Sequence, residues 1–123
     1  MYRYDTKFNP PAPVLPIQLS SPSRLSLLTV PALVDSGSDI TVIPRTLAQD
    51  LNLPPAYVAY SKGLSGAFEE STVFSAMVSI EREEPEITGV LTWDEDYVLL
   101  GRDIINHWKA LLDGPGLVLT VSR

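Results

Sequence analysis

The stretch ALVDSGSDITVI, residues 32–43, decides the fold class, because it places one acidic turn between two apolar, strand-forming segments. Asp35, Ser36 and Gly37 are common turn residues, since Asp and Ser side chains bond to nearby backbone and Gly accepts unusual dihedral angles. Taken as a bare tripeptide, this turn is most simply structural. The apolar flanks change that interpretation, because an aspartate enclosed by such strands is expected to be partly desolvated, where an isolated carboxylate is costly. Carboxylates in such surroundings are concentrated at functional sites, although structural ones occur too.

The rest of the sequence predicts short strands joined by turns, with one or two short helices. Its 7 glycines and 11 prolines favour turns over long helices. Strands are expected at residues 24–34 (two pieces interrupted at Pro31), 40–43, 57–61, 71–80, 87–93, 97–100, 111–112 and 117–121. Short helices are expected at residues 45–51, directly after Pro44, and at residues 103–110. The predicted fold class is therefore mainly β.

A chain of 123 residues suits one compact domain, and no internal repeat or long linker divides it. Residues 1–23 are rich in proline and are expected to form an extended N-terminal arm or edge segment rather than a helix. Residues 24–123 are the predicted domain.

Composition excludes several classes of function. The net charge is −6 and the nine basic residues are scattered, whereas a nucleic-acid surface needs clustered Lys and Arg. The chain has no cysteine and a single histidine, His107, which rules out thiolate nucleophiles and multi-histidine metal sites. No apolar run is long enough to cross a membrane and no signal peptide is evident, so a cytoplasmic protein without a membrane partner is the default expectation. We predict no metal and no cofactor, which leaves carboxylates, hydroxyls, amines and the backbone for chemistry.

Three features in order along the chain resemble the aspartic proteases. Residues 33–38 match the signature of two apolar residues, Asp, Ser or Thr, Gly, and Ala or Ser. Residues 98–105 (VLLGRDII) are similar to a second signature, which in retroviral-type members opens the C-terminal helix. Between them lies a turn that stands where these enzymes carry a flap hairpin: Gly63, Leu64, Ser65 and Gly66. The chain therefore resembles the retropepsin-like aspartic proteases, most closely their small prokaryotic members.

This resemblance implies the fold and the roles of the first signature. The fold would be a single-domain retropepsin-like one, closed and barrel-like, with one flap hairpin. Asp35 would be the catalytic acid, sharing one proton with its copy in a second chain and activating a water, as the general account of aspartic proteases describes. Ser36 would brace the two catalytic loops, Gly37 would let the two backbones approach closely, and Ser38 would complete the loop.

The resemblance also implies roles outside the catalytic loop. Asp39 and Arg102 would form a buried ion pair that ties this loop to the C-terminal helix; the alternative is a solvated surface contact of little energetic value. Residues 63–66 would form a mobile flap over the substrate, or else a plain hairpin turn.

One catalytic loop in a short chain implies a homodimer that cuts a peptide or protein substrate, because half a dyad cannot activate the water. The Pro-rich arm and the hairpin over residues 111–121 depart from the terminal strands of viral enzymes, so an interface other than interleaved termini could orient the subunits. The main alternative is the same fold used for dimerisation or peptide binding without hydrolysis. A weaker one is a non-proteolytic β-barrel scaffold.

Overall fold

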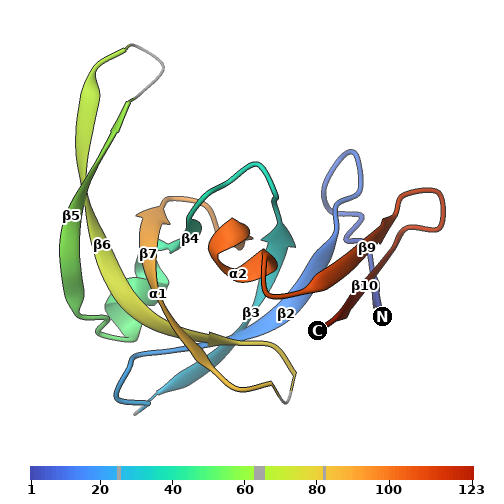
Figure 1. Ribbon diagram of the computed structural model, residues 1–123, viewed down its shortest axis with the longest axis horizontal. Helices are drawn as coiled ribbons and strands as arrows, with labels where there is room; N and C mark the ends of the chain where they lie inside the picture. The colour runs from blue at the N-terminus through green and yellow to red at the C-terminus, as the bar shows by residue number, and fades with distance from the viewer. Residues whose placement is uncertain (25, 63–65, 82) are drawn as a thin grey trace.

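Strands dominate the protein, whose computed structural model describes residues 1–24, 26–62, 66–81 and 83–123 (Figure 1). The strands are β1 (Tyr2–Arg3), β2 (Val14–Ser20), β3 (Leu27–Val34), β4 (Thr41–Pro44), β5 (Pro55–Lys62), β6 (Phe68–Ser79), β7 (Glu86–Trp93), β8 (Val98–Leu100), β9 (Lys109–Asp113) and β10 (Val118–Ser122). The helices are α1 (Arg45–Asp50) and α2 (Arg102–Ile105). The prediction of a mainly β domain with short helices is confirmed. None of the helices in the described ranges has the length and apolar character needed to span a bilayer.

Seven strands form one sheet that closes on itself. Their order is β2-β3-β8-β4-β7-β6-β5, and β2 also pairs with β6, so the strands from β2 to β6 complete a ring with β5 attached outside it. The closing pairs are antiparallel and set Gln18 opposite Ser79 and Ser20 opposite Met77. This closure confirms the predicted barrel-like fold.

Apolar side chains fill the barrel, and they come from every strand of the ring. The fully buried ones include Leu15, Ile17, Leu19, Ala32, Ile43, Ala76, Val90, Val98 and Leu100. Helix α1 begins after Pro44, close to the predicted position, and adds Ala48 to this core. Burial of these side chains supplies the main favourable term in folding.

The N-terminal segment is extended, as expected, but it is also packed into the fold. β1 pairs with β10, and β2 contributes three of the fully buried core residues. The hydrophobic core therefore lies on both sides of the boundary that we predicted between residues 23 and 24. The expected break at Pro31 is wrong, because β3 runs through it. Pro31 lies opposite Pro16, and the ladder to β8 starts only at Ala32, so no strand pairing requires an N–H at Pro31.

The two C-terminal strands and the N-terminal strand β1 form a second sheet in the order β1-β10-β9. The predicted closing hairpin is confirmed, but the predicted helix over residues 103–110 is wrong beyond Ile105. The N–H groups of His107 and Trp108 bond the carbonyls of Ile104 and Ile105, three residues back, which is the tight last turn of an ending helix. Lys109 then begins β9 because β10 offers it a full antiparallel ladder from Lys109–Ser122 to Asp113–Val118.

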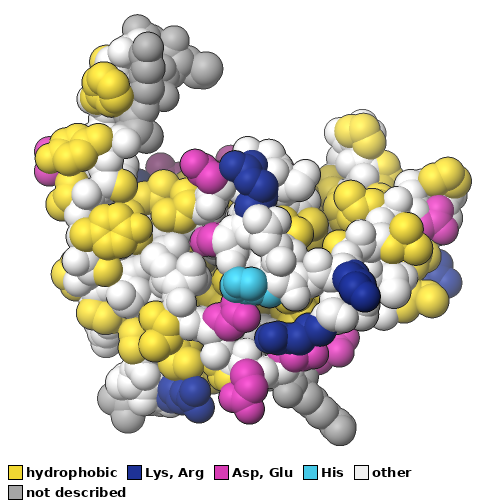
Figure 2. Space-filling view, viewed as in Figure 1, with side chains coloured by type: hydrophobic (Ala, Val, Ile, Leu, Met, Phe, Trp, Pro, Cys, Tyr) yellow, Lys and Arg dark blue, Asp and Glu magenta, His cyan; other side chains and the backbone are white. Residues whose placement is uncertain are grey.

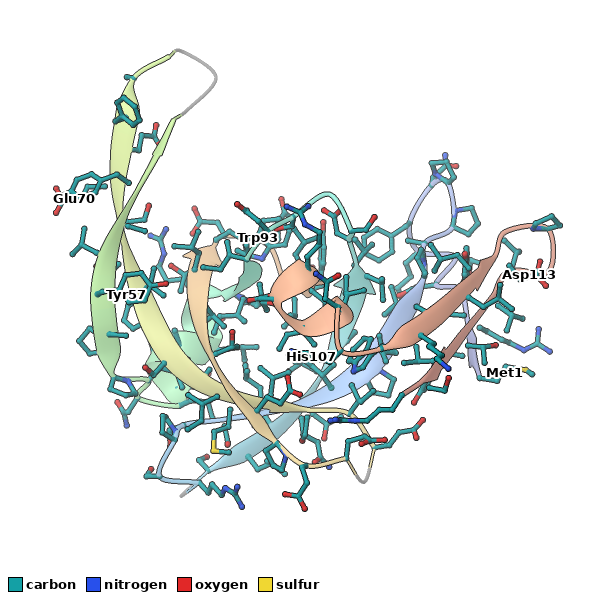
Figure 3. The ribbon with its side chains drawn as sticks, viewed as in Figure 1. Met1, Tyr57, Glu70, Trp93, His107 and Asp113 are labelled. Carbon is teal, nitrogen blue, oxygen red and sulfur yellow. The ribbon has the colours of Figure 1, made fainter. Side chains whose placement is uncertain are left out.

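The hairpin of β5 and β6 extends away from the barrel, at the upper left of Figure 1. The first half of β6 pairs only with β5, whereas its second half pairs with β7 and β2 inside the ring. The hairpin is thus continuous with the barrel through β6. Large apolar side chains are exposed on it, including Tyr57, Tyr60 and Phe68. In Figure 3, Tyr57 and Glu70 mark this part of the molecule.

Candidate active site

Asp35 directly follows β3, at a point where two neighbouring strands of the barrel end side by side. β3 ends at Val34 and its parallel neighbour β8 ends at Leu100, directly opposite. The N–H of Asp35 donates to the carbonyl of Leu100 at 3.0 Å, which fixes the start of the Asp35 loop, residues 35–39, against β8. The two signatures that lie far apart in the sequence therefore meet here, as predicted from their resemblance.

Hydrogen bonds within the Asp35 loop orient the carboxyl group of Asp35. Its Oδ1 accepts a hydrogen bond from the N–H of Gly37 at 2.8 Å, and its carbonyl accepts one from the N–H of Ser38 at 3.2 Å. The hydroxyl of Ser38 donates to the carbonyl of Ile40 at 2.7 Å, closing the loop on its far side. Asp35 is half-buried, while Ser36 and Gly37 are exposed. The loop therefore presents one oriented carboxylate toward the surface.

A pocket of about 280 Å³ opens beside this carboxylate. Asp35 and Ser36 supply its polar wall, and the remaining lining is apolar: Val34, Ile105, Ala110 and Leu112. Two of these residues belong to β9, so the C-terminal sheet borders the candidate catalytic group. A partly apolar surrounding of this kind strengthens electrostatic interactions of the acid with whatever fills the pocket.

The predicted buried ion pair between Asp39 and Arg102 is absent from the described residues. Asp39 is exposed, and the guanidinium Nη1 of Arg102 instead donates to the carbonyl of Ser36 at 2.7 Å. The N–H of Arg102 also donates to the carbonyl of Ser38 at 2.8 Å. Arg102 therefore connects α2 to the Asp35 loop through backbone carbonyls, not through the carboxylate that we predicted.

Asp103, rather than Asp39, makes a partly buried set of hydrogen bonds at the start of α2. Its carboxylate accepts from the N–H of Thr41 at 3.0 Å, from the hydroxyl of Thr41 at 2.8 Å and from the hydroxyl of Thr88 at 3.2 Å. The fully buried Thr41 hydroxyl in turn accepts from the N–H of Gly101 at 3.1 Å. These bonds join β4, β7 and the start of α2, next to the Asp35 loop that precedes β4. The Gly-Arg-Asp signature contained Asp103, but nothing in the spacing pointed to Thr41 and Thr88 as its partners.

Removing the hydroxyl of Thr41 is expected to destabilise the fold. Thr41→Val keeps the shape of the side chain but leaves the Asp103 carboxylate and the Gly101 N–H each one hydrogen bond short in a buried place. We expect a loss of about 1–3 kcal/mol in the free energy of unfolding, measured by urea denaturation. Thr120→Val, at an exposed strand position, is the matched control and should change it little. Equal stability of both variants would show that this buried network contributes nothing.

The predicted flap residues fall mostly outside the part of the chain that the structure describes. Gly63, Leu64 and Ser65 are not described. Gly66 is exposed, with a φ of 83° that favours glycine, and it precedes β6. The arms on either side are β5 and β6, so a hairpin occupies the place where the resemblance predicted one. Whether it acts as a flap stays a prediction.

The segment between β7 and β8 lies at the start of β8, the opposite end of this strand from Asp35. Trp93 donates from its indole N–H to the carbonyl of Tyr97 at 2.9 Å, and the two rings meet edge to face at 5.1 Å. Burial raises the pKa of Tyr97 above its ordinary value, and the negative charges of Glu95 and Asp96 raise it further. Tyr97 therefore stays a neutral phenol, and it fixes the chain just before β8.

Comparison of the sequence with models of protein families shows the family of this chain. The family model described as aspartyl protease matches residues 24–104, more than half of the chain. The chain belongs to the aspartyl protease family. The matched residues include both the Asp35 loop and the segment Gly101–Asp103. No curated protein matches it.

Solved structures of retroviral and bacterial proteases share the fold of this aspartyl protease-family chain. The retropepsin-like aspartic protease from Rickettsia conorii has a TM-score of 0.58 at 18% identity, covering 89% of this chain and 85% of that one. EIAV protease in complex with the inhibitor HBY-793 has a TM-score of 0.56 at 18% identity, with 78% and 86% covered. The simian foamy virus (mac) protease has a TM-score of 0.54 at 21% identity, with 75% and 92% covered. The retropepsin-like fold expected from the sequence is thereby confirmed.

Proposed function

We propose that this protein is an aspartic endopeptidase that hydrolyses peptide bonds with a water held between Asp35 and the Asp35 of the partner subunit. The observation that carries the proposal is the half-buried Asp35 carboxylate, oriented by the Gly37 N–H and set beside a pocket in an intact Asp-Ser-Gly loop. Membership of the aspartyl protease family supports the same conclusion.

The chemistry requires two carboxyl groups in different protonation states. Two like charges placed close together cannot both ionise easily, so the pair holds one proton between its members. The ionised member takes a proton from the water, while the protonated member donates to the carbonyl oxygen of the substrate. Attack of the water on the carbonyl carbon gives a gem-diol, and proton transfer to the departing amide nitrogen breaks the peptide bond. No covalent enzyme intermediate forms.

The second carboxyl group must come from another copy of the chain, because each chain has only one Asp-Ser-Gly loop. In this homodimer Ser36, exposed at the tip of the loop, braces one catalytic loop against the other. The exposed Gly37 lets the two backbones approach where a Cβ would collide.

The substrate is an extended peptide that lies between the catalytic loop and the β5–β6 hairpin. An extended segment presents its main-chain N–H and C=O groups to strand edges, and its alternate side chains enter pockets. Two of the aromatic side chains exposed on the hairpin, Tyr60 and Phe68, lie on the same face of it and suit the apolar side chains of such a peptide. Closure of this hairpin excludes bulk water from the reacting groups.

Mixing experiments test whether two chains share one site. Wild-type protein and Asp35→Asn protein are combined at fixed total concentration, allowed to exchange subunits, and assayed on a fluorogenic peptide library. If only wild-type pairs are active, the rate follows the square of the wild-type fraction, about one quarter in an equal mixture. A linear dependence would contradict the shared site. Absence of turnover in the wild type, with peptide binding retained, would favour the binding module instead.

A further inference from the structure

Strand β9 is exposed along its whole length. All five of its residues are exposed, and Leu111 and Leu112 expose 65% and 52% of their surface. Within the described chain, β9 pairs with β10 on one side only, so its other edge presents free N–H and C=O groups. Hydrophobic side chains gather over this hairpin at the right of Figure 2. An apolar strand with a free edge is a ready template for pairing with another chain.

This strand is also continuous with the candidate active site. Ala110 and Leu112, which alternate to the same face of β9, line the pocket that contains Asp35 and Ser36. Lys109, Leu111 and Asp113 point to the opposite face. A chain that pairs with the free edge of β9 therefore reaches the immediate surroundings of the catalytic acid.

The sequence of β9 is complementary to itself in one antiparallel register. If two copies pair about Leu111, Lys109 of each chain lies opposite the partner's Asp113, Ala110 lies opposite the partner's Leu112, and the two Leu111 side chains meet. Opposite charges facing one another across strands stabilise the pair, and like charges destabilise it. Figure 3 shows Asp113 at the far end of the hairpin, well removed from His107, which precedes the strand. In this register one Lys–Asp pair lies at each end of the two strands, and the apolar residues lie between the two pairs.

We propose that the free edges of two β9 strands pair antiparallel in this register, joining two copies of the chain through a continuous six-stranded sheet. The sheet order is β1-β10-β9 followed by the partner's β9, β10 and β1. The two-fold axis of such a pair is normal to the sheet, so both catalytic loops lie over the same face of it. Each Leu112 then sits beside the partner's Ala110 at the wall of the Asp35 pocket. This inference rests on the proposed two-chain active site and assigns the interface that completes it.

The arrangement needs no exchange of terminal strands between subunits. β10 already pairs with one edge of β9 within the same chain, and β1 follows on the other side of β10. Each subunit therefore brings a finished three-stranded sheet to the interface. Isologous contacts of this kind close the assembly at two copies.

A single engineered thiol tests the register directly, because the chain has no cysteine. In Leu111→Cys the two thiols face one another, and directly opposed residues of antiparallel strands have Cα atoms about 4.5–5.5 Å apart, within the range a disulfide accepts. Mild oxidation should convert most of the protein to a covalent dimer that keeps its peptidase activity. Ile87→Cys, equally exposed at 67% on β7, is the matched control and should remain largely uncrosslinked.

Charge reversal provides a second, independent test. Lys109→Asp or Asp113→Lys alone places like charges at both ends of the paired strands, and each should weaken dimerisation about tenfold or more in sedimentation velocity. The double variant restores opposite charges and should recover most of that loss. Circular dichroism checks that each variant folds.

The outcomes separate the interface from the function. A dimeric, active protein whose Leu111→Cys variant crosslinks no faster than Ile87→Cys, or whose double charge variant is no better than the singles, overturns the β9 interface and leaves the proposed function intact. A wild-type protein that stays monomeric and inactive with saturating peptide overturns both.

Discussion

Asp35→Asn is expected to lower the rate of peptide hydrolysis by about 10³-fold or more, because the amide can neither take a proton from water nor share one with the partner's Asp35. The substitution is nearly isosteric. The amide oxygen can still accept the hydrogen bond that the Gly37 N–H donates to Oδ1. The loop should therefore keep its conformation, and the loss of rate reports chemistry rather than unfolding.

Steady-state cleavage of a peptide library, with thermal unfolding of the same samples, checks this result. Asp50→Asn is the matched control, since it makes the same chemical change at an exposed position of α1, away from the catalytic loop. Turnover should be unaffected in the control. Equal rates for wild type and Asp35→Asn would refute the assignment of Asp35 as the catalytic acid.

Gly101→Ala is expected to destabilise the protein more than any other small substitution considered, by about 3 kcal/mol. A Cβ at this position would lie 2.6 Å from the carbonyl carbon, 2.8 Å from the oxygen and 2.9 Å from the nitrogen of Ile40. These are backbone atoms at the end of the catalytic loop, which cannot turn aside as a flexible side chain can. The backbone of Gly101 itself, at φ −90° and ψ 179°, is ordinary for any residue, so the cost is steric.

Thermal unfolding measures this cost, which corresponds to a fall of roughly 10 °C in Tm for a domain of this size. Gly114→Ala is the control, because a Cβ there meets nothing within 4 Å. We expect the control to unfold close to the wild type at the same protein concentration. If Gly101→Ala were as stable as Gly114→Ala, the two signatures would not be in the tight contact described above.

Local sequence patterns predicted most of the fold because strand-forming segments and their turns are short-range features. Residues 40–43 and 87–93 have the β-branched and apolar composition of strands, and both became strands of the barrel. The helix after Pro44 followed from the conformational preference of proline at a helix start. The segment after Ile105 was mispredicted because its apolar spacing suits a helix as well as a strand. Pairing with β10, a tertiary effect, decided between them.

The same distinction applies to the candidate site. Asp35 and its loop were predictable, because a turn motif with apolar flanks is a contiguous signal. The partner of Arg102 was not, since the choice between the Asp39 carboxylate and the Ser36 carbonyl depends on the path of the loop in space. Likewise Thr88 reaches Asp103 only because β7 lies beside β4 in the barrel. Spacing along one chain contains no information on such cross-strand distances.

The length of β6 has a mechanical consequence. One half of this 12-residue strand belongs to the barrel, and the other half belongs to the projecting hairpin. The register between β5 and β6 shifts between Pro55 and Tyr57, where the hairpin joins the barrel. Because the projecting half of β6 pairs only with β5, the hairpin can bend at this register shift without breaking any pairing of the ring. The hairpin movement proposed above therefore leaves intact the strand pairings that position Asp35.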